Sequence, residues 1–204
     1  MKTSLFSLFV LFAFLFTSSA TAKFVLDSRG NPLENGGSYY ILPHIWPLGD
    51  GLDLAKTGNN ETCPLSVVVL PYTININYGL PWTILSPSRI RFVPTNTKLD
   101  FFSVEGKVPT CVPIPSKWSI LEGEDGIKSV EISGCEKTVE GRFKIEATTS
   151  YAYKIVFCPI NGDSCKDLGM SSSGRQLVIT DDIPLYVVFF KAESSSDAQR
   201  ASIM

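Results

Sequence analysis

The sequence is poor in the residues that most enzymes use for catalysis. Its 204 residues contain one histidine, His44, which lies between prolines and apolar residues in Leu42-Pro43-His44-Ile45-Trp46-Pro47. A serine or cysteine hydrolase would need this histidine as a base, oriented by a carboxylate and within reach of a nucleophile. The chain also lacks a Gly-x-Ser-x-Gly turn and a phosphate-binding glycine loop. We therefore expect that His44 is structural and that the protein is not an enzyme.

Metal ligands are scarce as well. There is no Cys-x-x-Cys pair, and no cysteine lies near His44 in the sequence, which argues against zinc. Acidic residues do pair in Asp50-Gly51-Leu52-Asp53 and in Asp181-Asp182, but these segments are rich in turn residues, where carboxylates are usually solvated. We expect no metal and no cofactor.

Neither a basic cluster nor a membrane-spanning run is present. The net charge is −2 and Lys and Arg form no block, so the sequence offers no electrostatic footprint for nucleic acid or for an anionic membrane. The apolar stretch Leu5–Phe16 is shorter than the roughly 20 residues of a membrane helix. Because Lys2 precedes it and Ser18-Ser19-Ala20-Thr21-Ala22 follows it, this stretch is typical of a secretory signal. We predict a signal peptide at residues 1–22 and export of a soluble, monomeric chain, to the extracellular space or the vacuole.

After residue 22, no window of helical length keeps an apolar period of 3.6 residues. Short apolar or alternating runs recur instead, separated by turn residues such as Asn35-Gly36-Gly37. The predicted strands are Tyr39–Leu42, Leu65–Leu70, Thr83–Leu85, Leu99–Val104, Trp118–Leu121, Ser129–Ile132, Arg142–Ala147, Tyr151–Phe157, Gln176–Ile179 and Leu185–Phe190. This pattern predicts one all-β domain over residues 23–192, which is a sandwich, a barrel or a trefoil. Residues 193–204 lack periodicity and are predicted to be a disordered tail.

All five cysteines follow the predicted signal. In an oxidising compartment most of them should pair, and the odd count leaves at least one free or bonded to another chain. The five are Cys63, Cys111, Cys135, Cys158 and Cys165. Export also exposes Asn60-Glu61-Thr62, a glycan acceptor sequence in a polar stretch, to the modifying enzyme.

The segment from Ser86 to Phe92 is suited to recognition by a trypsin-like protease. Its arginine, Arg89, offers a cationic fork on a long stem, and the apolar Ile90 follows it. Pro87 fixes its own backbone angle and favours an extended Ser86, so the loop would lose little freedom on binding. One interpretation is a bait for a protease, and the other is an ordinary loop that contains an Arg-Ile pair.

Several motifs, spread over almost the whole exported chain, resemble those of the Kunitz soybean trypsin inhibitor family of plants. The first follows the predicted cleavage site and reads Phe24-Val25-Leu26-Asp27-Ser28-Arg29-Gly30-Asn31-Pro32-Leu33-Glu34-Asn35-Gly36-Gly37-Ser38-Tyr39-Tyr40-Ile41-Leu42. The others are Cys63-Pro64-Leu65-Ser66-Val67-Val68, Cys111-Val112-Pro113-Ile114-Pro115-Ser116-Lys117-Trp118-Ser119, Tyr153-Lys154-Ile155-Val156-Phe157-Cys158-Pro159, and Arg175-Gln176-Leu177-Val178-Ile179-Thr180 with Pro184-Leu185.

The resemblance implies a β-trefoil of about twelve short strands in three divergent units. It implies the disulfides Cys63–Cys111 and Cys158–Cys165, and it leaves Cys135 as a free thiol. It also implies competitive, substrate-like inhibition of a trypsin-like serine protease in a 1:1 complex. The scissile bond would be Arg89-Ile90, in a loop formed by Ser86, Pro87, Ser88, Arg91 and Phe92 and braced by the side chain of Asn35.

Two departures from the family pattern bear on this expectation. Ser88 stands where the best-known trypsin inhibitors carry an aromatic residue, which makes the contact beside the arginine smaller. Cys135 has no counterpart in the four-cysteine pattern. The family also contains storage, taste-modifying and other binding proteins, so the fold alone does not establish inhibition. The alternative function is therefore a storage protein, or a carbohydrate- or small-ligand-binding protein, of the same fold.

Overall fold

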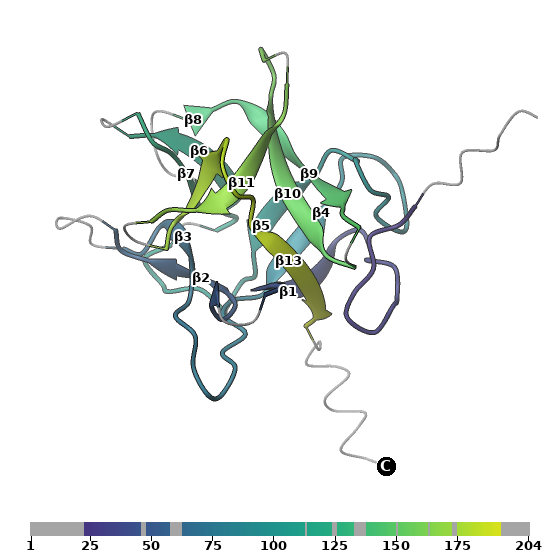
Figure 1. The fold of residues 1–204 in the computed structure, drawn as a ribbon, viewed down its shortest axis with the longest axis horizontal. Coiled ribbons are helices and arrows are strands. Elements are labelled where there is room, and N and C mark those ends of the chain that lie inside the picture. The colour runs from purple at the N-terminus through teal and green to yellow at the C-terminus, as the bar shows by residue number, and fades with distance from the viewer. Residues whose placement is uncertain are drawn as a thin grey trace, which may run out of the picture.

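The structure is a computed structural model that describes residues 23–45, 48–57, 63–112, 114–123, 126–132, 138–149, 151–162, 164–172 and 175–192. Four of the sequence-based predictions lie outside these residues: the signal peptide at 1–22, the glycan acceptor Asn60, the thiol of Cys135 and the tail at 193–204. The described part of the chain is all-β, with thirteen strands and no α-helix (Figure 1).

The strands are short, as the alternating apolar runs predict. They are β1 (Gly37–Pro43), β2 (Leu52–Ala55), β3 (Ser66–Val69), β4 (Trp82–Leu85), β5 (Asp100–Ser103), β6 (Trp118–Glu122), β7 (Lys128–Ile132), β8 (Thr138–Val139), β9 (Gly141–Ala147), β10 (Tyr153–Pro159), β11 (Lys166–Met170), β12 (Leu177–Thr180) and β13 (Tyr186–Lys191).

Strands from all parts of the chain close into a barrel. Going around it, β4 pairs with β1, β1 with β13, β13 with β10, and β10 with β9, all antiparallel. The bridge between Leu99 and Phe143 joins the start of β5 to β9, and β5 pairs with β4 to complete the ring. Closure removes the exposed sheet edges that would otherwise pair with another chain.

Three hairpins meet at one end of this barrel. The hairpins β2–β3, β6–β7 and β11–β12 are joined pairwise, through Ser66 and Glu131, through Val178 and Ser129, and through Val68 and Gln176. A barrel capped by three hairpins, one from each third of the chain, is the architecture of a β-trefoil. The sequence-based prediction of this fold is confirmed, with β8 as an additional short strand that pairs with β6.

Large aromatic side chains fill the barrel. Phe101 stacks on Trp118 with ring centroids 4.5 Å apart, and Trp82 and Phe143 meet Trp118 edge-on at 5.2 and 5.8 Å. Where two aromatic residues are adjacent on a strand, one lies in the core and the other does not: Phe101 is buried and Phe102 is half-buried. This is the alternation expected of a strand with one face in the core.

Three strands, β2, β8 and β11, were not predicted from the sequence. β11 reads Lys-Asp-Leu-Gly-Met, and Lys, Asp and Gly are all depleted in strands. It forms because β10 and β12 pair with its two edges. In the other direction, Tyr151 was predicted to begin a strand but lies in a bend, with a φ of 57°, and is 96% exposed. β10 therefore begins at Tyr153.

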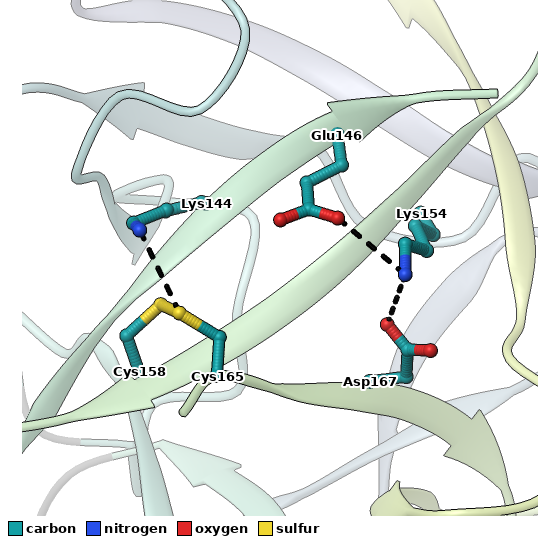
Figure 2. Close-up of a disulfide and its surroundings, with 6 residues drawn as sticks. All are labelled: Lys144, Glu146, Lys154, Cys158, Cys165 and Asp167. Carbon is teal, nitrogen blue, oxygen red and sulfur yellow. Dashed lines mark hydrogen bonds and ion pairs between the residues drawn. A yellow bond between two sulfur atoms is a disulfide. The ribbon is translucent and has the colours of Figure 1, made fainter. Parts of the chain in front are cut away.

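Both disulfides implied by the family resemblance are present in the structure. Cys63 is bonded to Cys111, and Cys158 is bonded to Cys165. Figure 2 shows the second bond beside Lys144, whose Nζ lies 3.6 Å from Cys165 Sγ. Next to it, Lys154 forms ion pairs with Asp167 at 2.8 Å and Glu146 at 3.4 Å, which links β9, β10 and β11. The hydrogen bond to Asp167 is the main reason that the pKa of Lys154 is raised.

We expect the two bridges to differ in their effect on stability, and Cys135 to stay outside both. Because the first joins residues 48 apart and the second residues 7 apart, loop entropy gives stabilisations of about 4 and about 2.4 kcal/mol. The Cys63→Ser/Cys111→Ser variant should therefore melt at a lower temperature than Cys158→Ser/Cys165→Ser.

Peptide mapping without reductant should recover Cys135 as a thiol, and recovery of Cys135 joined to any of the other four cysteines would overturn this assignment.

Candidate functional site

The candidate site is the loop of residues 86–92, which leaves β4 at Leu85. In this loop Pro87, Ser88, Arg89 and Arg91 are exposed, Ile90 and Phe92 are half-buried, and Ser86 is only 4% exposed. The loop is therefore anchored at Ser86 and at its Phe92 end, and it projects its cationic residues into solvent.

One side chain, that of Asn35, spans the loop. Its Nδ2 donates to the carbonyl oxygens of Ser88 at 3.3 Å and Ile90 at 3.1 Å, and its Oδ1 accepts from the backbone N–H of Ser86 at 2.6 Å. The backbone N–H of Asn35 donates to the carbonyl of Arg91 at 2.9 Å. Asn35 thus holds backbone atoms on both sides of Arg89 while leaving Arg89 itself uncovered.

Arg89 lies at the apex of a tight turn. The N–H of Ile90 donates to the carbonyl of Ser88 at 2.9 Å, which closes a three-residue turn around the arginine. The neighbouring Arg91 has a different environment, because its guanidinium carbon lies 4.9 Å from the centre of the Phe92 ring. Such a cation–π contact attracts the guanidinium to the ring face. Both arginines are exposed, but Arg89 has no contact of this kind in the described structure.

The end of the loop is held by the N-terminal segment. Phe92 forms a β-bridge with Glu34, and its ring meets Phe24 edge-on at 6.0 Å. Val93 donates from its N–H to the carbonyl of Leu33 at 2.9 Å. The Phe92 end of the loop is therefore held by backbone pairing with Leu33 and Glu34 and by packing against Phe24.

The position of Asn35 follows from the residues around it. Glu34 donates from its N–H to the hydroxyl of the buried Tyr39 at 2.8 Å, and Gly36 donates to the carbonyl of Ile84 at 2.7 Å. Gly36 has a φ of 83°, a backbone conformation that favours glycine and turns the chain into β1 at this point. Sequence reading alone treats Asn35-Gly36-Gly37 as an ordinary turn; the structure places the asparagine of that turn against the loop.

Sequence reasoning missed a second brace inside the loop. The hydroxyl of the buried Ser86 accepts from the N–H of Ser88 at 3.2 Å. A serine that bonds the backbone two residues later is a known turn pattern, so the sequence Ser86-Pro87-Ser88 contained the signal.

The remaining candidate residues lie away from this loop. His44 is exposed. Asp50 was expected to be solvated but is only 1% exposed, because the chain of residues 70–80 folds over it. Asp53 is half-buried on β2, and desolvation raises its pKa. The described residues contain no group of three or more potential metal ligands and no helix that is long and apolar enough to cross a membrane.

The family of legume Kunitz proteins described as trypsin and protease inhibitors matches residues 25–191. The chain belongs to this Kunitz-type inhibitor family. Trypsin inhibitor A of Glycine max is 40% identical over 215 residues, which cover 98% of this chain and 96% of the relative. The family is one of protease inhibitors rather than of enzymes.

Solved structures of Kunitz-type inhibitors support the same assignment. A structure of soybean trypsin inhibitor is 40% identical, covers 83% of this chain and 100% of its own, and superposes with a TM-score of 0.75. A second structure contains soybean trypsin inhibitor in complex with porcine pancreatic trypsin; the matched chain is 38% identical, covers 84% of this chain and all of its own, and has a TM-score of 0.75.

Proposed function

We propose that this protein is a competitive, substrate-like inhibitor of trypsin-like serine proteases and that it presents the Arg89-Ile90 bond. The observation that carries the proposal is the contact of Asn35 with the carbonyl oxygens of both Ser88 and Ile90. These carbonyls lie on the two sides of Arg89, so one side chain supports both halves of the bond to be cut.

In the proposed complex, Arg89 enters the acidic specificity pocket of the protease. Its carbonyl carbon faces the nucleophilic serine, and its carbonyl oxygen faces the oxyanion hole. The long guanidinium stem matches a deep pocket with a carboxylate at its base, since a guanidinium can pair with a carboxylate through two hydrogen bonds. All of the catalytic groups belong to the protease.

Rigidity explains why such a substrate would inhibit rather than be consumed. If the protease cuts Arg89-Ile90, the Ser88 side stays bonded to Asn35 Nδ2 and to the hydroxyl of Ser86, and the Ile90 side stays bonded to the same Nδ2. The new ends then remain near each other, and re-ligation competes with release. A loop that is already ordered also loses little conformational entropy when it binds.

The proposal extends to the regions outside the described residues. Residues 1–22 would be removed as a secretory signal, Asn60 would accept a glycan during export, and residues 193–204 would form a tail. The mature protein would be a secreted or vacuolar monomer of a seed or storage tissue that acts in plant defence.

A stoichiometric titration tests the proposed function. A fixed concentration of active-site-titrated trypsin is incubated with increasing amounts of the protein, and residual activity is measured with a chromogenic substrate. We expect activity to fall linearly to near zero at a molar ratio of about one. Unchanged trypsin activity at several-fold excess, or digestion of the protein, would support a storage or ligand-binding role instead.

A further inference from the structure

A second loop, residues 71–79, connects β3 to β4 and carries an exposed aliphatic side chain. It reads Pro-Tyr-Thr-Ile-Asn-Ile-Asn-Tyr-Gly and contains no charged residue. Residues 71–78 are all exposed, and Ile74 is 90% exposed, although a free isoleucine would normally be placed inside a fold. In Figure 1 this loop, between β3 and β4, extends below the barrel.

The base of the loop is clamped rather than free. Residues 50–52 lie between its two stems: Asp50 N–H donates to the carbonyl of Leu70 at 2.9 Å, and Gly51 N–H donates to the carbonyl of Asn77 at 2.8 Å. The stems approach so closely that a Cβ on Gly51 would lie 1.9 Å from the carbonyl oxygen of Tyr78. The ring of Tyr78 also packs edge-on against Tyr40 and Phe190, at 5.5 and 5.4 Å.

One buried carboxylate holds both sides of the loop tip. Asp50 is 1% exposed, and its Oδ2 lies 2.5 Å from the hydroxyl of Thr73 and accepts from the N–H of Asn77 at 3.1 Å. The same hydroxyl of Thr73 lies 2.6 Å from the carbonyl oxygen of Asn75. Ile74 therefore stands between two fixed residues, and the peptide bond that follows it, Ile74-Asn75, has anchored atoms before and after it.

This construction matches that of the arginine loop. In each case a half-buried or buried polar side chain from an adjacent segment, Asn35 or Asp50, bonds to the chain before and after one exposed residue. In each case a cut beside that residue would leave both new ends attached to the same side chain. The loops differ in the chemistry of the exposed residue, which is Arg89 in one and Ile74 in the other.

We propose that residues 71–79 form a second protease-binding loop, which presents the Ile74-Asn75 bond to an elastase-like serine protease. The class of protease follows from the chemistry of the loop. A convex, uncharged loop with one protruding branched aliphatic side chain fits a protease cleft that has a small apolar specificity pocket. Tyr72 and Ile76, each 43% exposed, supply apolar contacts on either side. An acidic trypsin-type pocket would bury a carboxylate without a partner if Ile74 entered it, which disfavours trypsin at this loop. Asp50 acts as the positioning residue.

The first experiment measures inhibition of neutrophil elastase and of trypsin by the full exported chain and by three variants. We expect the unmodified protein to inhibit elastase. Ile74→Asp should weaken elastase inhibition at least about thirtyfold, because a charge would enter an apolar pocket, and should leave trypsin inhibition unchanged. Arg89→Ala should leave elastase inhibition within about twofold, so that failure of the arginine site and failure of this site can be told apart. Ile183→Asp, a change at an isoleucine that is 82% exposed in another turn, is the matched control and should affect neither.

The second experiment tests the tether. Thr73→Val removes the hydroxyl that bonds Asp50 and Asn75 but keeps the size of an exposed side chain. Incubation of this variant with elastase should produce cleavage between Ile74 and Asn75 over hours, detected by mass spectrometry, while the unmodified chain stays largely uncut. The proposal is overturned if the unmodified protein does not inhibit elastase, if Arg89→Ala abolishes that inhibition, or if Ile74→Asp leaves it intact. Concentration-dependent dimerisation that Ile74→Asp abolishes, without elastase inhibition, would instead make this loop a contact between copies of the chain.

Discussion

Replacement of Arg89 by alanine is expected to weaken trypsin inhibition by about thirtyfold or more. Arg89 is an exposed cation between two residues whose carbonyl oxygens Asn35 holds, so it is the residue that would fill the protease pocket. Truncating a central anchor of this kind commonly costs more than about 2 kcal/mol, and removal of its charge leaves a buried carboxylate of the protease without a partner. Inhibition constants from steady-state competition with a chromogenic substrate measure the change directly.

Arg91 provides the matched control for this substitution. It carries the same charge two residues away, but its guanidinium lies over the ring of Phe92 at 4.9 Å. Arg91→Ala should therefore change trypsin inhibition far less than Arg89→Ala. If Arg91→Ala is the more damaging of the two, or if Arg89→Ala has no effect, the contact residue has been misassigned.

Exchange of Arg89 for leucine tests the same assignment by a gain of function. Leucine suits the apolar specificity pocket of chymotrypsin, whereas an acidic pocket cannot pair with it. Arg89→Leu should move the preference of the inhibitor from trypsin toward chymotrypsin, measured as the ratio of the two inhibition constants. A ratio that stays the same would place the specificity outside this loop.

The fold was largely predictable, and the exceptions have a common physical cause. Strands such as β1 and β13 were predicted because each is a short run of apolar and aromatic residues. β2 and β11 contain Asp53 and Gly169, which disfavour strands locally. They form because β3 pairs with β2 and β12 pairs with β11, and this pairing cannot be predicted from the local sequence. The choice of a trefoil among all-β folds came from the family motifs and not from the alternation, which three architectures share.

The candidate site was predictable to a smaller extent. The local sequence marks Arg89 as a cleavable residue, but it does not connect Asn35 to a loop that lies more than fifty residues later, and the family resemblance supplied that link. The backbone turn around Arg89 comes only from the structure, whereas the bond between Ser86 and Ser88 follows a serine turn pattern that the sequence contains. Asp50 shows the same limit, because its burial depends on Thr73 and Asn77, which lie 23 and 27 residues away in the chain.

Replacement of Asn35 by alanine is expected to convert lasting inhibition of trypsin into temporary inhibition. The Asn35 side chain makes three hydrogen bonds to the backbone of the loop, at Ser86, Ser88 and Ile90. Its proposed role is therefore to hold the loop in place and not to contact the protease. Without these bonds the loop can still bind through Arg89, so the initial inhibition should stay close to normal. After cleavage, however, the two ends of the Arg89-Ile90 bond can separate, and re-ligation becomes slow compared with release.

The measurement is a time course rather than a single inhibition constant. Trypsin and a small excess of Asn35→Ala are incubated for hours, with residual activity assayed and the Arg89-Ile90 bond followed by mass spectrometry. Trypsin activity should return as the cut form accumulates, whereas the unmodified protein should keep the enzyme inhibited.

Two further variants show which part of Asn35 matters. Asn35→Asp keeps an oxygen that can accept from Ser86 but removes the Nδ2 that donates to Ser88 and Ile90, so it should behave like alanine if the tether to both carbonyls is decisive. Asn31→Ala, in the same N-terminal segment, removes only long contacts of 3.4 and 3.5 Å to Asp27 and should remain a lasting inhibitor. Thermal melting of each variant separates loop effects from unfolding. If Asn35→Ala melts at a lower temperature and yet keeps trypsin inhibited with Arg89-Ile90 uncut, Asn35 is a turn residue of the scaffold. The rigidity of the loop must then come from Ser86 and from the backbone pairing at Phe92.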